Sequence, residues 1–138
     1  MNPNFEKLAT AFATKNGLDP KHIVAGGAFE VSNILCSLLH DAEIDKDRFF
    51  VYADLGATPT KNPELAYLNL LKQNYDAFAV ANSRFSISPA NGHAIFTISL
   101  DANTTTFDHL MEEIKGAAAL GQEWQKSYFT GFQIGAKI

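Results

Sequence analysis

The spacing of apolar residues switches between a helical and a strand period, and this switch limits the fold more than any other feature. Residues 3–15 place apolar side chains at three- and four-residue steps, which predicts an amphipathic helix capped by Asn2 and opened by Pro3. From residue 28 to residue 55 the period is two, which predicts two or three strands joined by short turns.

The second half of the chain continues with a helix, further strands and a last helix. Residues 62–74 carry apolar side chains at helical spacing, which predicts a helix capped by Asn62 and opened by Pro63. Three segments have the strand period, namely 77–80, 84–88 and 93–101. The sequence PANG at 89–92 forms the turn between the last two. The final helix opens near Thr105, and its inner stripe consists of Phe107, Leu110, Met111, Ile114, Ala118 and Trp124.

Together these elements predict an α+β fold in the order helix, three strands, helix, three strands, helix. We expect a mainly antiparallel, twisted sheet with the helices packed on one of its faces. The length of 138 residues and the hydrophobic fraction of 46% indicate a single domain over residues 1–138 that can bury a core. Within it, residues 130–138 are expected to fray or to dock on the rest of the protein.

Charge and residue composition exclude several classes of function. The net charge of −4 has the wrong sign for a protein that holds phosphate backbones, so nucleic acid is not an expected partner. Apolar runs such as 34–39 are far too short to cross a bilayer, so no membrane insertion is expected. The single cysteine, Cys36, cannot form an internal disulfide, which fits the cytoplasm.

Patterns that carry catalytic or metal chemistry are absent from the sequence. The four histidines are scattered and lack metal-ligand spacing, so we expect neither a metal nor a cofactor. Cys36 and His40 are four residues apart, which in a strand is too far for a thiolate and its base to touch. No nucleophile elbow, phosphate loop or dinucleotide-binding glycine pattern occurs. The expectation is a binding protein and not an enzyme.

Three segments, in their order and spacing, resemble the Tir-chaperone (CesT-type) family, the class I chaperones of bacterial type III secretion. The first is a strand with a glycine and proline turn, FVYADLGATP at 50–59. The second is a helix that ends in Leu-Leu-x-x-Asn, ELAYLNLLKQN at 64–74. The third is a hairpin with a proline and Asn-Gly turn, FSISPANGHA at 85–94.

This resemblance implies a cytoplasmic bacterial homodimer without enzymatic activity. Such a protein binds the N-terminal segment of a secreted effector in extended form and keeps it competent for export. A further contact with the secretion ATPase is compatible with the resemblance. Binding of this kind needs apolar grooves and an exposed sheet edge and requires no reactive group.

Two sets of residues are expected to carry these contacts. The dimer contact is expected on the second helix and just after it, at Leu65, Tyr67, Leu68, Leu71, Tyr75 and Phe78. The effector grooves are expected to include apolar residues of the first helix and of the first strands, namely Phe5, Leu8, Phe12, Val31, Leu38, Phe50 and Tyr52. For each of these residues, plain core packing is the competing interpretation.

Two other functions fit the same composition. One is a small-ligand-binding α+β enzyme or pocket protein, in which Asp54 or His93 is the base. The other is a dimeric adaptor for an unrelated protein.

Overall fold

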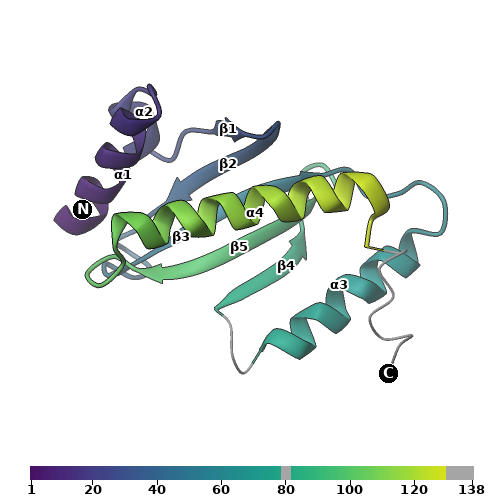
Figure 1. The fold of residues 1–138 in the computed structure, drawn as a ribbon. Helices are drawn as coiled ribbons and strands as arrows, with labels where there is room; N and C mark the ends of the chain where they lie inside the picture. Colours follow the sequence, from purple (N-terminus) through teal and green to yellow (C-terminus); the bar gives the residue numbers. More distant parts are fainter. Residues whose placement is uncertain (79–81, 130–138) are drawn as a thin grey trace.

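A five-stranded antiparallel sheet forms the centre of the computed structural model, which describes residues 1–78 and 82–129 (Figure 1). The strands are β1 (Phe29–Val31), β2 (Ile34–Leu39), β3 (Arg48–Gly56), β4 (Ser83–Ile87) and β5 (Ala94–Asp101). They lie in the order β1-β2-β3-β5-β4, and every neighbouring pair is antiparallel. The helices are α1 (Pro3–Lys15), α2 (Pro20–Val24), α3 (Pro63–Ala77) and α4 (Phe107–Ser127). The predicted α+β class is confirmed.

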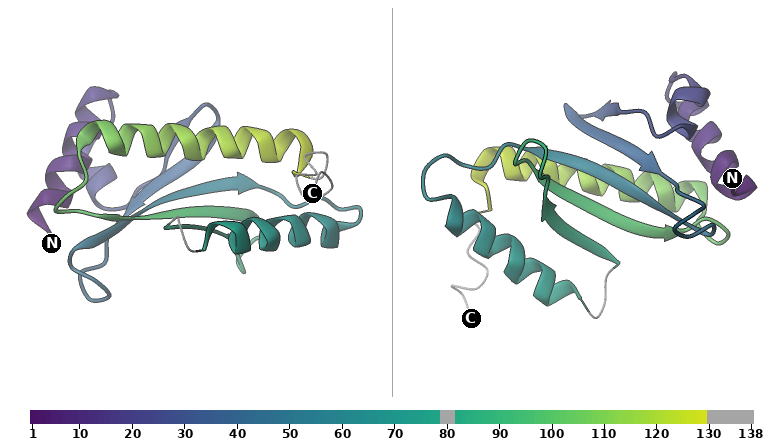
Figure 2. Two further views of the ribbon diagram at one scale, coloured as in Figure 1. Left: turned by 60° about the horizontal axis from the view of Figure 1, so that its bottom comes forward. Right: turned by 180° about the vertical axis from the view of Figure 1, so that it is seen from behind.

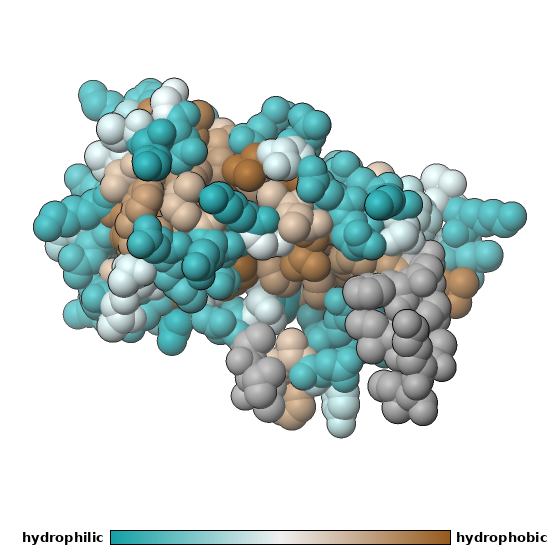
Figure 3. Space-filling model, in the orientation of Figure 1, coloured by the Kyte–Doolittle hydropathy of each residue, from teal (hydrophilic) through white to brown (hydrophobic). Residues whose placement is uncertain are grey.

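One face of the sheet is covered by α4, and the main core lies between them (Figure 2). The strand alternation of β3 turns Phe49, Val51 and Leu55 toward this face, where all three are buried. The inner stripe of α4 meets them with Leu110, Ile114 and Trp124, as the helical spacing predicts. On the side of α4, hydrophilic residues cover much of the outer surface (Figure 3).

The N-terminal helix closes one end of this core. Asn2 caps α1 by accepting hydrogen bonds from the backbone amides of Asn4 (2.8 Å) and Phe5 (3.1 Å), as predicted. The Phe5 ring lies 5.0 Å from the His40 ring and 5.2 Å from that of Phe49, measured between ring centres. The same helix therefore joins the ends of β2 and β3.

At the other end of the sheet, α3 lies beside the edge strand β4 and not over the centre of a face (Figures 1 and 2). Ala66 and Leu70 are the buried residues of this helix. The Asn74 side chain pairs with the backbone of Phe85, donating to its carbonyl oxygen (3.0 Å) and accepting from its amide (2.7 Å). At this point the Asn74 side chain makes the two backbone hydrogen bonds that a sixth strand would make.

Three local features differ from the sequence prediction. Helix α3 continues to Ala77 and Phe78 follows as its C-cap, so the strand predicted at 77–80 is wrong at its first two residues, and residues 79–80 lie outside the described part. A short helix, α2, was not predicted; it is capped by Asp19, which accepts from the Lys21 amide. Asn62 precedes α3 in a left-handed conformation (φ 52°) and makes no side-chain cap. The predicted tail at 130–138 also lies outside the described residues.

Candidate binding surfaces

The face of the sheet opposite α4 exposes apolar side chains. Seen from behind, β2, β3 and β5 lie in front of α4, and no helix of the described residues crosses over them (Figure 2). Leu39 and Phe50 are directly paired across β2 and β3 and are 36% and 37% exposed. Leu35 is exposed on the same face, and Tyr52 is half-buried there. We call the surface formed by Leu35, Leu39, Phe50 and Tyr52 the open sheet face.

A polar pair borders the open sheet face at the end of β3. The Nδ1 atom of His93 lies 2.9 Å and 3.1 Å from the two carboxylate oxygens of Asp54. Burial, together with the negative charge of Asp54, raises the pKa of Tyr52. Both members of the pair are partly open to solvent, which is not the closed cavity that the enzyme alternative requires.

A second apolar surface runs along α3. Its members are 37–75% exposed in the single chain, and we call them the outer stripe of α3: Leu65, Tyr67, Leu68, Leu71, Tyr75 and Phe78. These positions are separated by steps of one to four residues, and the helical turn places them on the broad side of α3 that faces away from the buried Ala66 and Leu70. The structure therefore brings together all the residues that the sequence suggested for a dimer contact.

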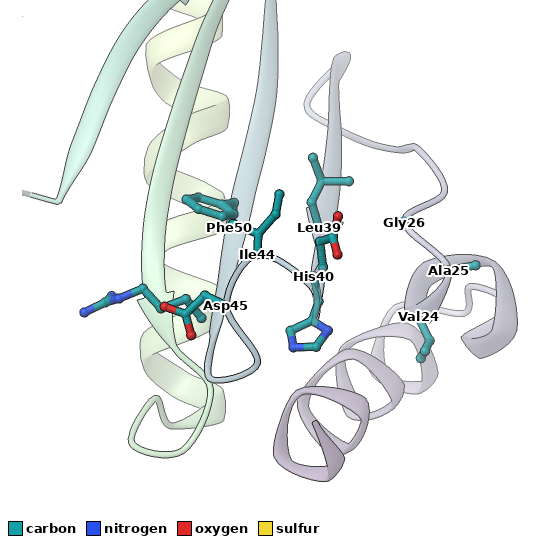
Figure 4. A pocket seen from close by; sticks show the side chains of 10 residues that line it. Val24, Ala25, Gly26, Leu39, His40, Ile44, Asp45 and Phe50 are labelled. Atoms are coloured by element: carbon teal, nitrogen blue, oxygen red, sulfur yellow. The ribbon is translucent and has the colours of Figure 1, made fainter. Parts of the chain in front are cut away.

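A pocket of about 390 Å³ lies where α2 meets the turn between β2 and β3 (Figure 4). Ile44, Leu39 and Phe50 converge on it from the turn and the two strands, and Val24 of α2 stands across from them. This pocket was not among the sites expected from the sequence. A single isoleucine inside the polar turn at 41–47 was the available sign.

The residues expected to form effector grooves are divided between the core and the surface. Phe5, Phe12 and Leu38 lie in the core. Leu8 and Val31 are half-buried and pack against the core from its border. Phe50 and Tyr52 lie side by side on the open sheet face, because residues two apart in a strand point the same way.

The described residues hold little that suggests catalysis. Among residues 1–78 and 82–129, no group of three or more His, Cys, Asp or Glu side chains could hold a metal ion. Burial raises the pKa of the Cys36 thiol to about 11, so it is not an activated nucleophile. No helix in this part of the chain is both long enough and apolar enough to span a membrane.

Comparisons with known proteins find the same fold in other structures. The structure is similar to the ExsC–ExsE complex, with a TM-score of 0.70 and 16% sequence identity, covering 91% of this chain and 94% of the other. The HopA1–SchA chaperone–effector complex gives a TM-score of 0.68 at 15% identity, covering 91% and 95%.

The Yersinia pestis type III secretion chaperone SycH, solved with a fragment of YscM2, gives a TM-score of 0.64 at 14% sequence identity. The match covers 86% of this chain and 98% of that one. The search of curated protein sequences gave no match. The model of the Tir chaperone protein (CesT) family matches residues 7–125. Because this match spans most of the sequence, the chain belongs to the Tir chaperone protein (CesT) family.

Proposed function

We propose that this protein is a class I type III secretion chaperone. It binds the N-terminal segment of a secreted effector in extended form and keeps that segment competent for export. It works as a homodimer in the bacterial cytoplasm and has no enzymatic activity. The family match supports this proposal, as do structural neighbours that were solved as chaperone–effector complexes.

The observation that carries the proposal is the open sheet face. Its four residues leave apolar area in water, whereas α4 packs over the opposite face. Side chains of an extended peptide alternate with a period of two, so every second residue can meet such a face. An unfolded effector segment is therefore a better match to this surface than a folded domain would be.

We assign the client contact to Phe50 and Tyr52, which the sequence already suggested for the effector grooves, together with Leu35 and Leu39. Leu8 and Val31 remain proposed contacts because both are half-buried, but they border the core and do not belong to the open sheet face. Phe5, Phe12 and Leu38 would reach a client only if the core opened, since none is exposed.

The dimer contact is assigned to the outer stripe of α3. Six apolar side chains on one helix lose water contact when a second copy packs against them, and apolar burial is the main driving force of association. A symmetric dimer then presents two open sheet faces to one effector segment.

The test is recovery of the client from the native bacterium under secreting conditions. A tagged copy of this protein should retain a larger protein, identified by mass spectrometry, whose N-terminal segment alone is protected from protease. The variant with Leu39→Asp and Phe50→Asp should lose this protein, because two carboxylates then occupy the apolar face.

The matched control is Ile87→Asp, which changes a similarly exposed aliphatic residue of β4 on the other side of the sheet. It should retain the client, and circular dichroism should show that all variants are folded. Retention of the client by the double variant would remove the open sheet face from the proposal. Recovery of the protein alone, with a small molecule bound, would favour the pocket-protein alternative.

A further inference from the structure

Hydrogen bonds within the turn at 41–47 shape the pocket beside α2. We call it the turn pocket; its apolar lining residues are Val24, Leu39, Ile44 and Phe50. The backbone amides of Ile44 and Asp45 both donate to the Asp41 carbonyl oxygen, at 3.1 and 3.0 Å. The Asp41 side chain also accepts from the Glu43 amide at 2.9 Å. These bonds hold the turn in a shape that leaves Ile44 79% exposed.

The base of the turn is fixed by His40. Its ring stacks on Phe5 at an angle of 16° between the planes, and its Nε2 lies 2.9 Å from the Lys46 carbonyl oxygen. Both contacts anchor the base of the turn. The pocket is present in the free chain, and a site formed before binding lowers the entropic cost of binding.

The rim of the pocket is acidic. Asp41 and Asp45 both border it, and neither belongs to an ion pair among the described residues. Arg48 also borders the pocket, and its Nη1 donates to the Ser99 hydroxyl on β5 at 3.2 Å. Segment 41–48 contains four acidic and two basic residues, so its local charge favours a cation over an anion.

We propose that the turn pocket binds one bulky apolar side chain of an extended peptide that carries a lysine or arginine two residues away. The apolar side chain contacts Ile44, Leu39 and Phe50, and the basic group meets Asp41 or Asp45. Residues two apart in an extended chain point the same way, so both can reach the chaperone together. This inference rests on the proposed function, of which it specifies the client chemistry.

Synthetic peptides test the proposal without requiring the natural client. Three nine-residue Gly/Ser peptides with blocked ends differ only at two positions two apart: Leu with Lys, Leu with Glu, and Ala with Lys. Each is titrated into the isotope-labelled full chain, and backbone amide shifts are followed by NMR. The Leu/Lys peptide should shift the amides of Ile44, Asp45 and Phe50 most strongly.

The expected differences follow from the two kinds of contact. The Leu/Glu peptide should bind about two- to five-fold more weakly than the Leu/Lys peptide, and about 0.5 M NaCl should remove this difference. The Ala/Lys peptide should not reach saturation, because it lacks the apolar contact.

Variants locate the binding site. Ile44→Ser should lower the affinity for the Leu/Lys peptide about five-fold, whereas Ile87→Ser should leave this affinity unchanged. The double variant Asp41→Asn and Asp45→Asn should remove the preference for Lys over Glu, since asparagine keeps the acceptor for the turn amides but not the charge. Glu112→Gln, on the exposed side of α4, is its matched control.

Equal binding of the Leu/Lys and Leu/Glu peptides, or unchanged binding by Ile44→Ser, would overturn the proposal. If the peptides do not bind as expected while the natural client is recovered, the proposal for the turn pocket is wrong and the chaperone function stands. If the peptides behave as expected and no client is recovered, the turn pocket stands as a peptide site and the chaperone function fails.

Discussion

Asn74 shows how one side chain can protect the edge of a sheet. Its amide group offers a donor and an acceptor to the same residue, Phe85, as a neighbouring strand would. Unpaired strand edges are sites of aggregation, so this contact favours a folded protein that stays in solution. It also gives a physical reason for an asparagine at the end of the segment ELAYLNLLKQN at 64–74.

Asn74→Ala should therefore destabilise the protein. The change leaves the Phe85 amide and carbonyl without their partner, which should lower the free energy of unfolding by about 1–3 kcal/mol. Urea denaturation followed by circular dichroism measures this difference. Gln73→Ala, one residue earlier on the same helix, is the control and should lower the free energy of unfolding much less. Equal stabilities of the two variants would contradict the role of the amide.

Cys36 should be chemically inert in the folded protein. Its thiol is buried, and burial raises its pKa to about 11. Near pH 8 only about 0.1% of the thiol is then ionised. We expect reaction with a thiol reagent at pH 8 to become fast only after denaturant unfolds the chain. Fast labelling of the native protein would contradict the burial of this residue.

The same pKa shift predicts how stability depends on pH. The folded state holds the Cys36 proton more tightly than the unfolded state, so unfolding releases this proton at pH values above the ordinary thiol pKa of 9.0. The free energy of unfolding should fall as pH rises from about 9 to about 11. A Cys36→Ala variant should lack this part of the decrease, which denaturation at several pH values measures.

At the scale of elements, α4 organises the end of β3 as well as the core. Trp124 donates its indole Nε1 to the Ala57 carbonyl oxygen at 3.0 Å, and Gln125 donates to the Leu55 carbonyl oxygen at 3.2 Å. Between them Gly56 adopts a φ of 108°, which favours glycine, next to a register shift in the β3–β5 pairing. The strand and turn at 50–59 thus depend on a helix more than sixty residues later.

Two glycines of the same helix should respond in opposite ways to alanine. A Cβ atom at Gly121 would lie 2.7 Å from the Ile34 side chain, whereas one at Gly116 would meet nothing within 4 Å. Gly121→Ala should destabilise the protein by about 1–2 kcal/mol through overpacking. Gly116→Ala should stabilise it by about 0.5–1 kcal/mol, because alanine loses less entropy in a helix.

Thermal and urea denaturation of the two variants provide the comparison. Each variant is the other's control, since the substitution and the helix are the same. A stabilising Gly121→Ala would show that α4 and β2 can separate without cost.

At the scale of the whole molecule, two different surfaces have two different proposed partners. The outer stripe of α3 lies beyond edge strand β4, and the open sheet face belongs to β2 and β3. A second copy bound to α3 therefore leaves Leu39 and Phe50 accessible to a client. Dimer formation and client binding should be separable by mutation.

The double variant Leu68→Glu and Leu71→Glu should be a monomer. Sedimentation equilibrium at micromolar concentration should give twice 15.1 kDa for the wild type and 15.1 kDa for the variant, because four carboxylates would otherwise face one another in a symmetric contact. Ile44→Glu, an exposed residue far from α3 in the sequence, should remain a dimer. A wild type that is monomeric at this concentration would refute the dimer proposal.

The concentration dependence of thermal unfolding provides a second measure. A dimer that unfolds to monomers melts at a higher temperature when the protein is more concentrated. The glutamate variant should be a folded monomer, so its melting temperature should not depend on protein concentration.

Features that depend on neighbouring residues were predictable from the sequence. The cap at Asn2, the turn at 89–92 and the inner stripe of α4 follow from hydrogen bonds and spacing within a few residues. Alternation within a strand likewise determines which residues of β3 share a face. Helical spacing puts the apolar residues 65, 68 and 71 on one side of α3, where the structure leaves them exposed.

What only the tertiary structure decided is which of these faces is covered. Alternation in β2 separates Leu38 from Leu39, but only the packing of the helices on one face of the sheet buries the first and leaves the second exposed. The insertion of β5 between β3 and β4, the Asn74 contact with Phe85 and the turn pocket around Ile44 all join segments distant in the chain. Such contacts depend on where whole elements pack, and a local pattern carries no information about that.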